Sequence, residues 1–418
     1  MKKMLFKVTK ITENTLVVGI DIGKDTHYAY LRTITIEGYK SFSFANTKQG
    51  FDYLLKRIRS FVKSHYIKDV VIGLESTGNC WLALAHYIKN NTDYTLVQVN
   101  SKHTKRFKDV TDNTSNKNDQ KDPRVIAQIV LIGSSLRVNL PVGTKATLRE
   151  LTRTRRGIAE ERKRIYNRLF SLLLVYNPEL CRLFKDITCK TCIYLLEHYP
   201  TPGSLDQVSG KNLTNELRRI SRGRFTIDKT NTLLKTSRES VSVTEGLDGY
   251  ISSVRLHLDQ IKLYTSQIKE VEARIEGLVT SVPEYMLLKS IKGFGKITAA
   301  TVISEIGDFS SFRTNNEILK YAGLNLIENS SGKHQSNKRI SKIGNEHLRT
   351  SIYFAAMRLI KKGGLYHKLY NHHLEKGMIK RKAVIAISRK LLCTVHSMIR
   401  TQRSFIVEYN HERTKKVA

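Results

Sequence analysis

Leu16-Val-Val-Gly-Ile-Asp21 and Asp69-Val-Val-Ile-Gly-Leu-Glu75 are the two stretches of this sequence that decide its fold. Each is a short apolar run rich in β-branched residues, which is typical of a strand buried in a core. Each also ends at an acidic residue. In α/β sheets the functional groups gather at the carboxyl ends of the strands, so Asp21 and Glu75 lie where such a fold places its chemistry.

Strand and helix patterns alternate around these two stretches. Further strands are expected at residues 27–36, as part of a hairpin or meander, and at 95–99. Helical patterns are expected at 51–64 and 80–89. This alternation predicts an α/β domain with a partly parallel sheet over residues 1–145.

Residues 146–280 have a different, mainly helical pattern. Apolar residues recur at heptad spacing in two places: Leu151, Ile158, Ile165 and Leu172, and then Ile261, Tyr264, Ile268, Val271, Ile275 and Leu278. This spacing predicts two antiparallel helices or a dimerising coiled coil. A core-facing stripe within one subunit explains the heptads equally well. Between the two heptad stretches we expect a more irregular insert, from Asn177 to about Leu247.

A compact helical domain is expected over residues 281–418. Residues 288–308 combine an apolar turn, a Gly-x-Gly hairpin and a helix that begins with small residues. The pattern is similar to a helix-hairpin-helix module, in which backbone amides and a helix N-terminus hold a phosphate. An ordinary corner between two helices is the alternative. The basic stretch 361–418 has a helical pattern, which suits either packing on this domain or contact with nucleic acid.

The charge balance points to a polyanionic partner. The 418 residues contain 71 Lys and Arg against 37 Asp and Glu, which gives a formal net charge of +34. Self-repulsion on this scale burdens a compact state and is relieved when the protein binds nucleic acid. The basic residues are spread along the whole chain rather than gathered on one amphipathic helix, which argues against attachment to a membrane surface.

Cysteine usage and hydropathy favour a cytoplasmic protein. Of the five cysteines, only Cys189 and Cys192 form a C-x-x-C pair, and no second pair lies near them to complete a metal site. No apolar run approaches the roughly 18 residues of a membrane span. The N-terminus lacks the long apolar stretch of a signal peptide.

A second pair of acids precedes an apolar helical pattern at about 123–131. Asp119 and Asp122 stand in the run Asn-Asp-Gln-Lys-Asp-Pro-Arg. On one helical turn an Asp-x-x-Asp pair shares a face, but Pro123 favours instead an Asp122 that caps the helix. Carboxylate oxygens are the ligands that Mg²⁺ prefers, and two-metal sites serve phosphoryl transfer. Four acids therefore suggest a metal site, although each alone is also an ordinary turn or capping residue.

The four acids, in this order, resemble the RuvC-like nuclease domain of the DEDD transposases of the IS110 insertion-sequence family. The C-terminal part is similar to that family's second domain, because it contains Ala-Gly-Leu at 322–324, Ser-Gly at 331–332 and Ile-Ser-Lys-Ile-Gly-Asn-Glu-His-Leu-Arg at 340–349. The resemblance spans about Leu16 to Gln402. It implies an α/β RuvC-like (RNase H-like) domain, then long helices or a coiled coil, then a mainly α domain with a helix-hairpin-helix-like motif.

The resemblance also implies a composite catalytic site with Mg²⁺ as its cofactor. The metal-binding acids of the family match Asp21, Glu75, Asp119 and Asp122. The serine that attacks the DNA phosphodiester matches Ser331, although the sequence does not separate it from Ser330. A serine hydroxyl needs a base or a metal beside it. We expect the basic residues of the same segment to stabilise the negative charge of the phosphate. They are Lys333, His334, Lys338 and Arg339. The family usually has alanine where this chain has Pro123.

The expected function is that of an insertion-sequence transposase, which cleaves and rejoins DNA strands by serine attack without ATP. The resemblance implies a homodimer or tetramer on DNA, a structured guide RNA from the element, and a place in the bacterial nucleoid. A basic surface serves either nucleic acid. Two alternatives stay open: a metal-dependent nuclease or junction resolvase that uses water as the nucleophile, and a non-catalytic nucleic-acid-binding protein.

Overall fold

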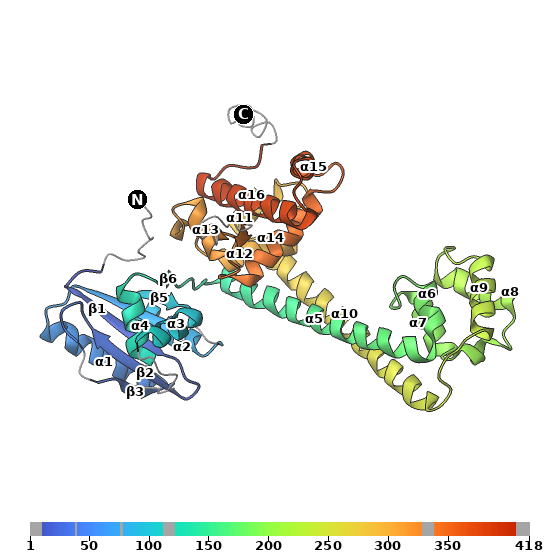
Figure 1. The fold of residues 1–418 in the computed structure, drawn as a ribbon, viewed down its shortest axis with the longest axis horizontal. Helices are drawn as coiled ribbons and strands as arrows, with labels where there is room; N and C mark the ends of the chain where they lie inside the picture. Colours follow the sequence, from blue (N-terminus) through green and yellow to red (C-terminus); the bar gives the residue numbers. More distant parts are fainter. Residues whose placement is uncertain (1–10, 38–39, 76–77, 112–121, 328–337, 407–418) are drawn as a thin grey trace. The chain divides into compact units, whose positions relative to one another are not determined.

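The computed structural model describes residues 11–37, 40–75, 78–111, 122–327 and 338–406. The chain divides into two compact units, residues 1–140 and 141–418 (Figure 1). Each unit has its own hydrophobic core, so each is described by itself.

The N-terminal unit is built on a six-stranded mixed sheet. Its strands are β1 (Thr15–Asp21), β2 (Thr26–Arg32), β3 (Phe42–Ala45), β4 (Asp69–Glu75), β5 (Thr95–Val99) and β6 (Leu136–Arg137). Their order is β3-β2-β1-β4-β5-β6. The central β1–β4 and β4–β5 pairs are parallel, and the outer pairs are antiparallel. The expected α/β domain with a partly parallel sheet is confirmed.

Helices cover both faces of this sheet. They are α1 (Lys48–Ser64), α2 (Trp81–Asn91), α3 (Ser101–Thr111) and α4 (Asp122–Leu131). The even-numbered residues of β1 pack with α1 and α2 in one core, while Val17 packs with the apolar side of α4 in another. Because successive side chains of a strand point to opposite faces, α4 lies on the face opposite to α1 and α2.

The expected second strand is shorter than predicted. It was expected at 27–36 but ends at Arg32. Thr33 turns the chain there, because its backbone N–H donates to the Ile36 carbonyl and its hydroxyl accepts from the Ile36 N–H at 2.8 Å. A threonine hydroxyl that bonds the backbone in this way competes with strand pairing. The apolar and β-branched composition alone did not reveal this turn.

The second unit contains an antiparallel pair of helices of 33 residues each, α5 (Thr144–Tyr176) and α10 (Leu247–Val279) (Figure 1). The start of α5 and the end of α10 share one core, and the opposite ends share another. Ile261, Ile268 and Ile275 are buried within the single chain. The heptads therefore form an antiparallel helical hairpin in one subunit, which is one of the interpretations left open by the spacing.

The sequence pattern predicts an irregular segment between these two helices, and this prediction is wrong. It folds into α6 (Pro178–Leu183), α7 (Lys190–His198), the 3₁₀ helix η1 (Pro202–Leu205), α8 (Gly210–Ile220) and α9 (Ile227–Arg238). These elements enclose a core together with the far ends of α5 and α10. The helices are short, and Pro, Gly, Ser and Thr separate them. Each helix therefore contains too few turns for a helical period of apolar residues to stand out in the sequence.

The remaining helices pack around the core that the start of α5 shares with the end of α10. They are α11 (Pro283–Lys289), α12 (Lys296–Ile306), η2 (Phe309–Ser311), α13 (Asn315–Tyr321), α14 (Glu346–Leu359), α15 (His367–Glu375) and α16 (Lys380–Thr401). A two-stranded sheet joins β7 (Leu326–Ile327) to β8 (Arg339–Ile340). One side of α16 lies in this core through residues such as Leu391 and Leu392, so the α16 part of the basic C-terminal stretch packs on the domain. None of the described helices combines the length and hydropathy needed to cross a bilayer.

Candidate active site

Asp21 and Glu75 end two adjacent parallel strands and lie on the same face of the sheet. In the β1–β4 register Gly19 pairs with Gly73 and Ile20 with Leu74. Each acid is two residues beyond a glycine, and residues two apart in a strand share a face. Val17 and Val71, which precede those glycines by two residues, pack against α4. Both half-buried carboxylates therefore belong to the α4 side of the sheet.

The two glycines let α4 lie unusually close to the strands. A Cβ atom on Gly19 would lie 2.0 Å from the Pro123 carbonyl oxygen and 2.6 Å from the Ala127 nitrogen. A Cβ atom on Gly73 would lie 2.5 Å from Cγ2 of Val130. Real Cβ atoms essentially never lie at such distances, so a larger residue at Gly19 would push the α4 backbone away, and one at Gly73 would displace the Val130 side chain. The first turn of α4 therefore crosses β1 two residues before Asp21.

Asp122 is the first residue of this helix and is half-buried. Pro123 lies in the first turn, where its missing N–H costs no hydrogen bond. The structure thus brings the start of α4, with Asp122, to the edge of the sheet at which β1 and β4 end. Asp119 lies outside the described residues, so its position relative to Asp122 stays a prediction.

The three acids at this edge offer only oxygen ligands. Within the described residues no three His, Cys, Asp or Glu side chains lie close enough together to hold a metal ion. A metal ion bound by Asp21 and Glu75 therefore needs a further ligand from outside the described side chains, for example Asp119 or a phosphate of the substrate. The chemistry of the donors suits a hard cation such as Mg²⁺.

Ser331 and Ser330 lie outside the described residues, as do Lys333 and His334, in the segment that joins β7 to β8. The ends of that segment are firmly held. The Ser341 hydroxyl donates to Oδ1 of Asn325 at 2.5 Å, and its backbone N–H donates to the Asn325 carbonyl at 2.9 Å. The Lys342 N–H donates to the Gly323 carbonyl at 3.0 Å. The exposed Lys338 and Arg339 flank the segment on its C-terminal side.

Asn345, from the Ile-Ser-Lys-Ile-Gly-Asn signature, fixes this hairpin to the domain. Its Oδ1 accepts from the Leu348 N–H at 3.0 Å and caps α14. Its backbone N–H donates to the Tyr321 carbonyl at 2.7 Å, and its Nδ2 donates to Oε2 of Glu305 at 2.8 Å. Through its side chain and its backbone N–H, Asn345 therefore links the start of α14, the end of α13 and the buried carboxylate of α12.

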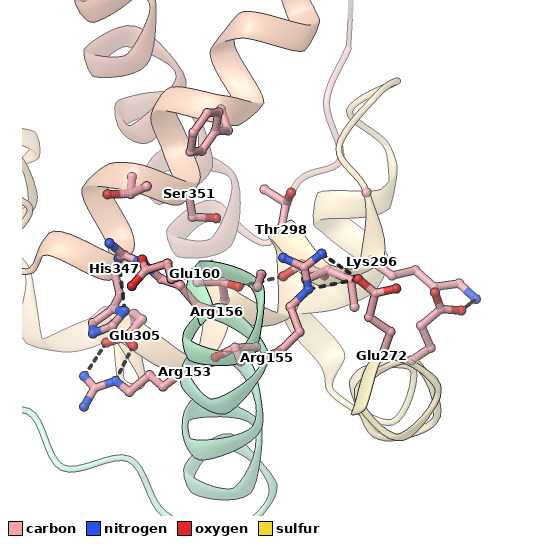
Figure 2. Close-up of a pocket in the computed structure, with 18 of the residues that line it drawn as sticks. Arg153, Arg155, Arg156, Glu160, Glu272, Lys296, Thr298, Glu305, His347 and Ser351 are labelled. Atoms are coloured by element: carbon pink, nitrogen blue, oxygen red, sulfur yellow. Dashed lines mark hydrogen bonds and ion pairs between the residues drawn. The ribbon is translucent and has the colours of Figure 1, made fainter. Parts of the chain in front are cut away.

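Glu305 is a fully buried carboxylate that the sequence analysis did not identify (Figure 2). Arg153 of α5 binds it with two hydrogen bonds, from Nε to Oε1 at 2.7 Å and from Nη2 to Oε2 at 2.9 Å. Nε of Arg149 lies 3.7 Å from Oε2. Burial opposes ionisation, but the hydrogen bonds from Arg153 and Asn345 together with these positive charges lower the pKa of Glu305 below its ordinary value. A lone acid in the apolar run Val302-Ile-Ser-Glu-Ile306 was the signal that could have revealed it.

A pocket of about 870 Å³ lies beside Glu305, lined by α5, α10, α12 and α14 (Figure 2). Most of its charged side chains are paired across it. Arg155 lies 2.7 Å from Glu272, and Lys296 lies 2.7 Å from Glu276. Such pairing is typical of helices that hold one another together, so we assign this pocket a structural role.

Comparison with known proteins identifies the chain. A family model described as "Transposase" matches residues 18–178, and a model described as "Transposase IS116/IS110/IS902 family" matches residues 285–371. The first match contains all four predicted acids, and the second contains Ser331, Glu305 and Asn345.

Several relatives agree with this. A 44.8 kDa protein of insertion element IS116 from Streptomyces clavuligerus is 25% identical over 393 residues, which cover 93% of this chain and 95% of that protein. An IS110 protein from Streptomyces coelicolor is 26% identical over 290 residues, or 68% of this chain and 71% of that protein. A pilin gene-inverting protein of Moraxella bovis is 32% identical over 155 residues, or 35% of this chain and 48% of that protein.

The chain is a transposase, an enzyme that cleaves and rejoins DNA. It belongs to the IS110 family of insertion-sequence transposases, as the acids and the C-terminal signatures predicted.

Proposed function

We propose that this transposase cuts and rejoins DNA by attack of Ser331 on a phosphodiester, with Asp21, Glu75, Asp119 and Asp122 as its metal-binding acids. The observation that carries the proposal is the arrangement at the edge of the N-terminal sheet. Two neighbouring parallel strands end in carboxylates on one face, and the helix packed on that face begins with a third.

The sheet order supports a RuvC-like domain. An antiparallel meander of β3, β2 and β1 is extended by the parallel strands β4 and β5, and the acids lie at the carboxyl ends of its central strands. In the second unit, α11 and α12 flank a turn in which Gly293 has a φ of +94°. That arrangement supports a helix-hairpin-helix-like contact to a DNA phosphate.

The proposed donor set fits Mg²⁺, because all four residues are carboxylates. When bound, Mg²⁺ would lower the pKa of a nucleophile and offset the charge that develops on the phosphate. The role of the chain's own residues is to hold these carboxylates in place. Gly19 and Gly73 do so by allowing α4 to approach the strands.

The serine step conserves the energy of the broken bond. The Ser331 oxygen would form a bond to phosphorus while a DNA oxygen leaves, and the proton of the hydroxyl would end on that leaving oxygen, so that atoms and charge balance. The phosphoserine ester can then be attacked by another DNA hydroxyl, which rejoins strands without ATP. Glu305 and Asn345 anchor the hairpin from which Ser331 acts.

The proposal extends to the partners of the enzyme. Family resemblance and a net charge of +34 support an assembly of two or four copies on DNA in the nucleoid, together with a guide RNA from the element. The acids of one copy and the serine of another would then act on the same phosphodiester.

The test is a covalent trapping experiment. Purified protein, the element's RNA and end-labelled donor DNA are incubated with Mg²⁺, denatured, and separated to detect label attached to protein. We expect adducts with wild type and with Ser330→Ala, and none with Ser331→Ala. Mg²⁺-dependent cleavage without adducts in any of the three would overturn the serine step and favour a resolvase-like nuclease that uses water.

A further inference from the structure

The helices inserted at the far end of the α5–α10 hairpin have no assigned role. Residues 179–284 lie outside both family matches, and the insert forms a core of its own with the hairpin. Its last two helices, α8 and α9, are joined by a turn at residues 221–226. The catalytic proposal makes no use of this module.

The α8–α9 segment is densely basic. Residues 210–238 contain two acids, Glu216 and Asp228, and eight basic residues, all of them exposed: Lys211, Arg218, Arg219, Arg222, Arg224, Lys229, Lys235 and Arg238. Five of the eight, which we call the turn cluster, lie at the end of α8, in the turn and at the start of α9: Arg218, Arg219, Arg222, Arg224 and Lys229.

The turn cluster combines five closely spaced cations with a lack of acidic partners. Several cations of the α5–α10 hairpin are paired, among them Arg155 with Glu272 and Lys262 with Glu197. Within the described residues no Asp or Glu forms an ion pair with a member of the turn cluster. Glu216 accepts from the Tyr194 hydroxyl at 3.1 Å instead. Clustered, exposed arginines without acids repel one another and favour a polyanion.

The turn holds this cluster in a fixed arrangement. Phe225 is buried and stacks on Phe184, with ring centroids 5.8 Å apart, and its backbone N–H donates to the Ser221 hydroxyl at 2.9 Å. A buried hydrogen bond of 2.9 Å from the Thr214 hydroxyl to the Thr230 hydroxyl joins α8 to α9. Arg222 and Arg224 therefore stand on either side of an anchored turn, beside Gly223, which has open space around it.

We propose that the turn cluster is a docking surface for the sugar–phosphate backbone of B-form DNA. Arginine matches phosphate geometry with two parallel N–H donors. Unpaired strands are recognised by stacking on exposed aromatic rings, and the only aromatic residue of 210–238, Phe225, is buried. A helix enters the wide major groove of B-form DNA, whereas the narrow major groove of duplex RNA does not admit one. The insert would thus hold donor or target duplex at the end of the α5–α10 hairpin opposite to helices α11–α16. This inference does not depend on serine attack.

The test measures the affinity of the full-length protein for duplexes in EDTA, where no cleavage occurs. The probes are a labelled 40-bp DNA of arbitrary sequence and an RNA duplex of the same sequence. The variant is R222N/R224Q, because asparagine tolerates the positive φ of +54° at Arg222. The charge-matched control is R59A/K63A, which removes two exposed cations of α1 on the sheet face opposite to α4. Thermal unfolding of each variant verifies that it folds.

We expect R222N/R224Q to weaken DNA binding on the order of tenfold at 0.1 M salt and to lower the slope of log K against log salt by about 2, with a smaller effect on the RNA duplex. The control should stay within about twofold of wild type. A folded R222N/R224Q that binds DNA as well as the control does would overturn the proposal. So would a loss confined to the RNA duplex.

Discussion

Gly19→Ala is the substitution that tests most sharply how the fold positions the acids. The new Cβ would lie 2.0 Å from the Pro123 carbonyl oxygen, where ordinary contact begins at 3.4 Å. The first turn of α4 must therefore move away from β1 by more than about 1 Å. Overpacking of this kind costs about 1–3 kcal/mol, and displacing catalytic groups by about 1 Å lowers activity roughly 100-fold.

The assay compares Mg²⁺-dependent cleavage of donor DNA and thermal unfolding for Gly19→Ala and for Gly157→Ala. Gly157 lies within helix α5, and a Cβ there meets nothing within 4 Å, so its replacement should stabilise the protein by about 0.5–1 kcal/mol. We expect Gly19→Ala to lose stability and most of its activity while Gly157→Ala keeps both. A Gly19→Ala protein with wild-type cleavage would refute the reasoning that close packing of α4 sets the site.

Three further results are expected. Glu305→Gln leaves Arg149 and Arg153 without their buried carboxylate and should cost about 3–5 kcal/mol, whereas Glu160→Gln, in the surface pair with Arg156, should cost less than about 1 kcal/mol in the same denaturant titration. The fold lowers the pKa of Glu305, so the ionised Glu305 stabilises the protein above its ordinary pKa of 4.5, and this stabilisation is lost as pH falls through the lowered pKa. Unfolding temperatures at pH 6 and pH 3.5 should therefore differ more for wild type than for Glu305→Gln. Equal differences for the two proteins would contradict this. Glu75→Gln should bind DNA normally yet cleave it at least about 100-fold more slowly, and unchanged cleavage would remove Glu75 from the site.

Much of the N-terminal unit could be predicted because its strands are nearly continuous apolar runs. Asp69–Glu75 and Thr95–Val99 are observed at the expected residues, and the adjacency of Asp21 and Glu75 follows from the parallel pairing of their strands. The close approach of α4 was harder to predict from the sequence, since a glycine in a strand has several explanations until the helix that it contacts is known.

The second unit shows where sequence reasoning fails. Its insert was expected to be irregular because helices such as Pro178–Leu183 are too short for a periodic pattern. Glu305 was missed for a different reason. Its partners Arg153 and Asn345 are 152 and 40 residues away in the chain, so only the tertiary structure joins them. The assignment of Asp119 and Ser331 rests on the family signatures and stays a prediction, as does the division of the chain into three domains.

Mass spectrometry of the trapped protein–DNA adduct tests the central claim most directly. Trypsin should release residues Tyr321–Lys333 as one peptide, because Lys320 and Lys333 flank it. After nuclease treatment, the account predicts a nucleotide phosphate on this peptide, and fragmentation should assign it to Ser331 rather than Ser330. Cleaved DNA accompanied only by unmodified peptide, or by a nucleotide on another residue, would contradict the account.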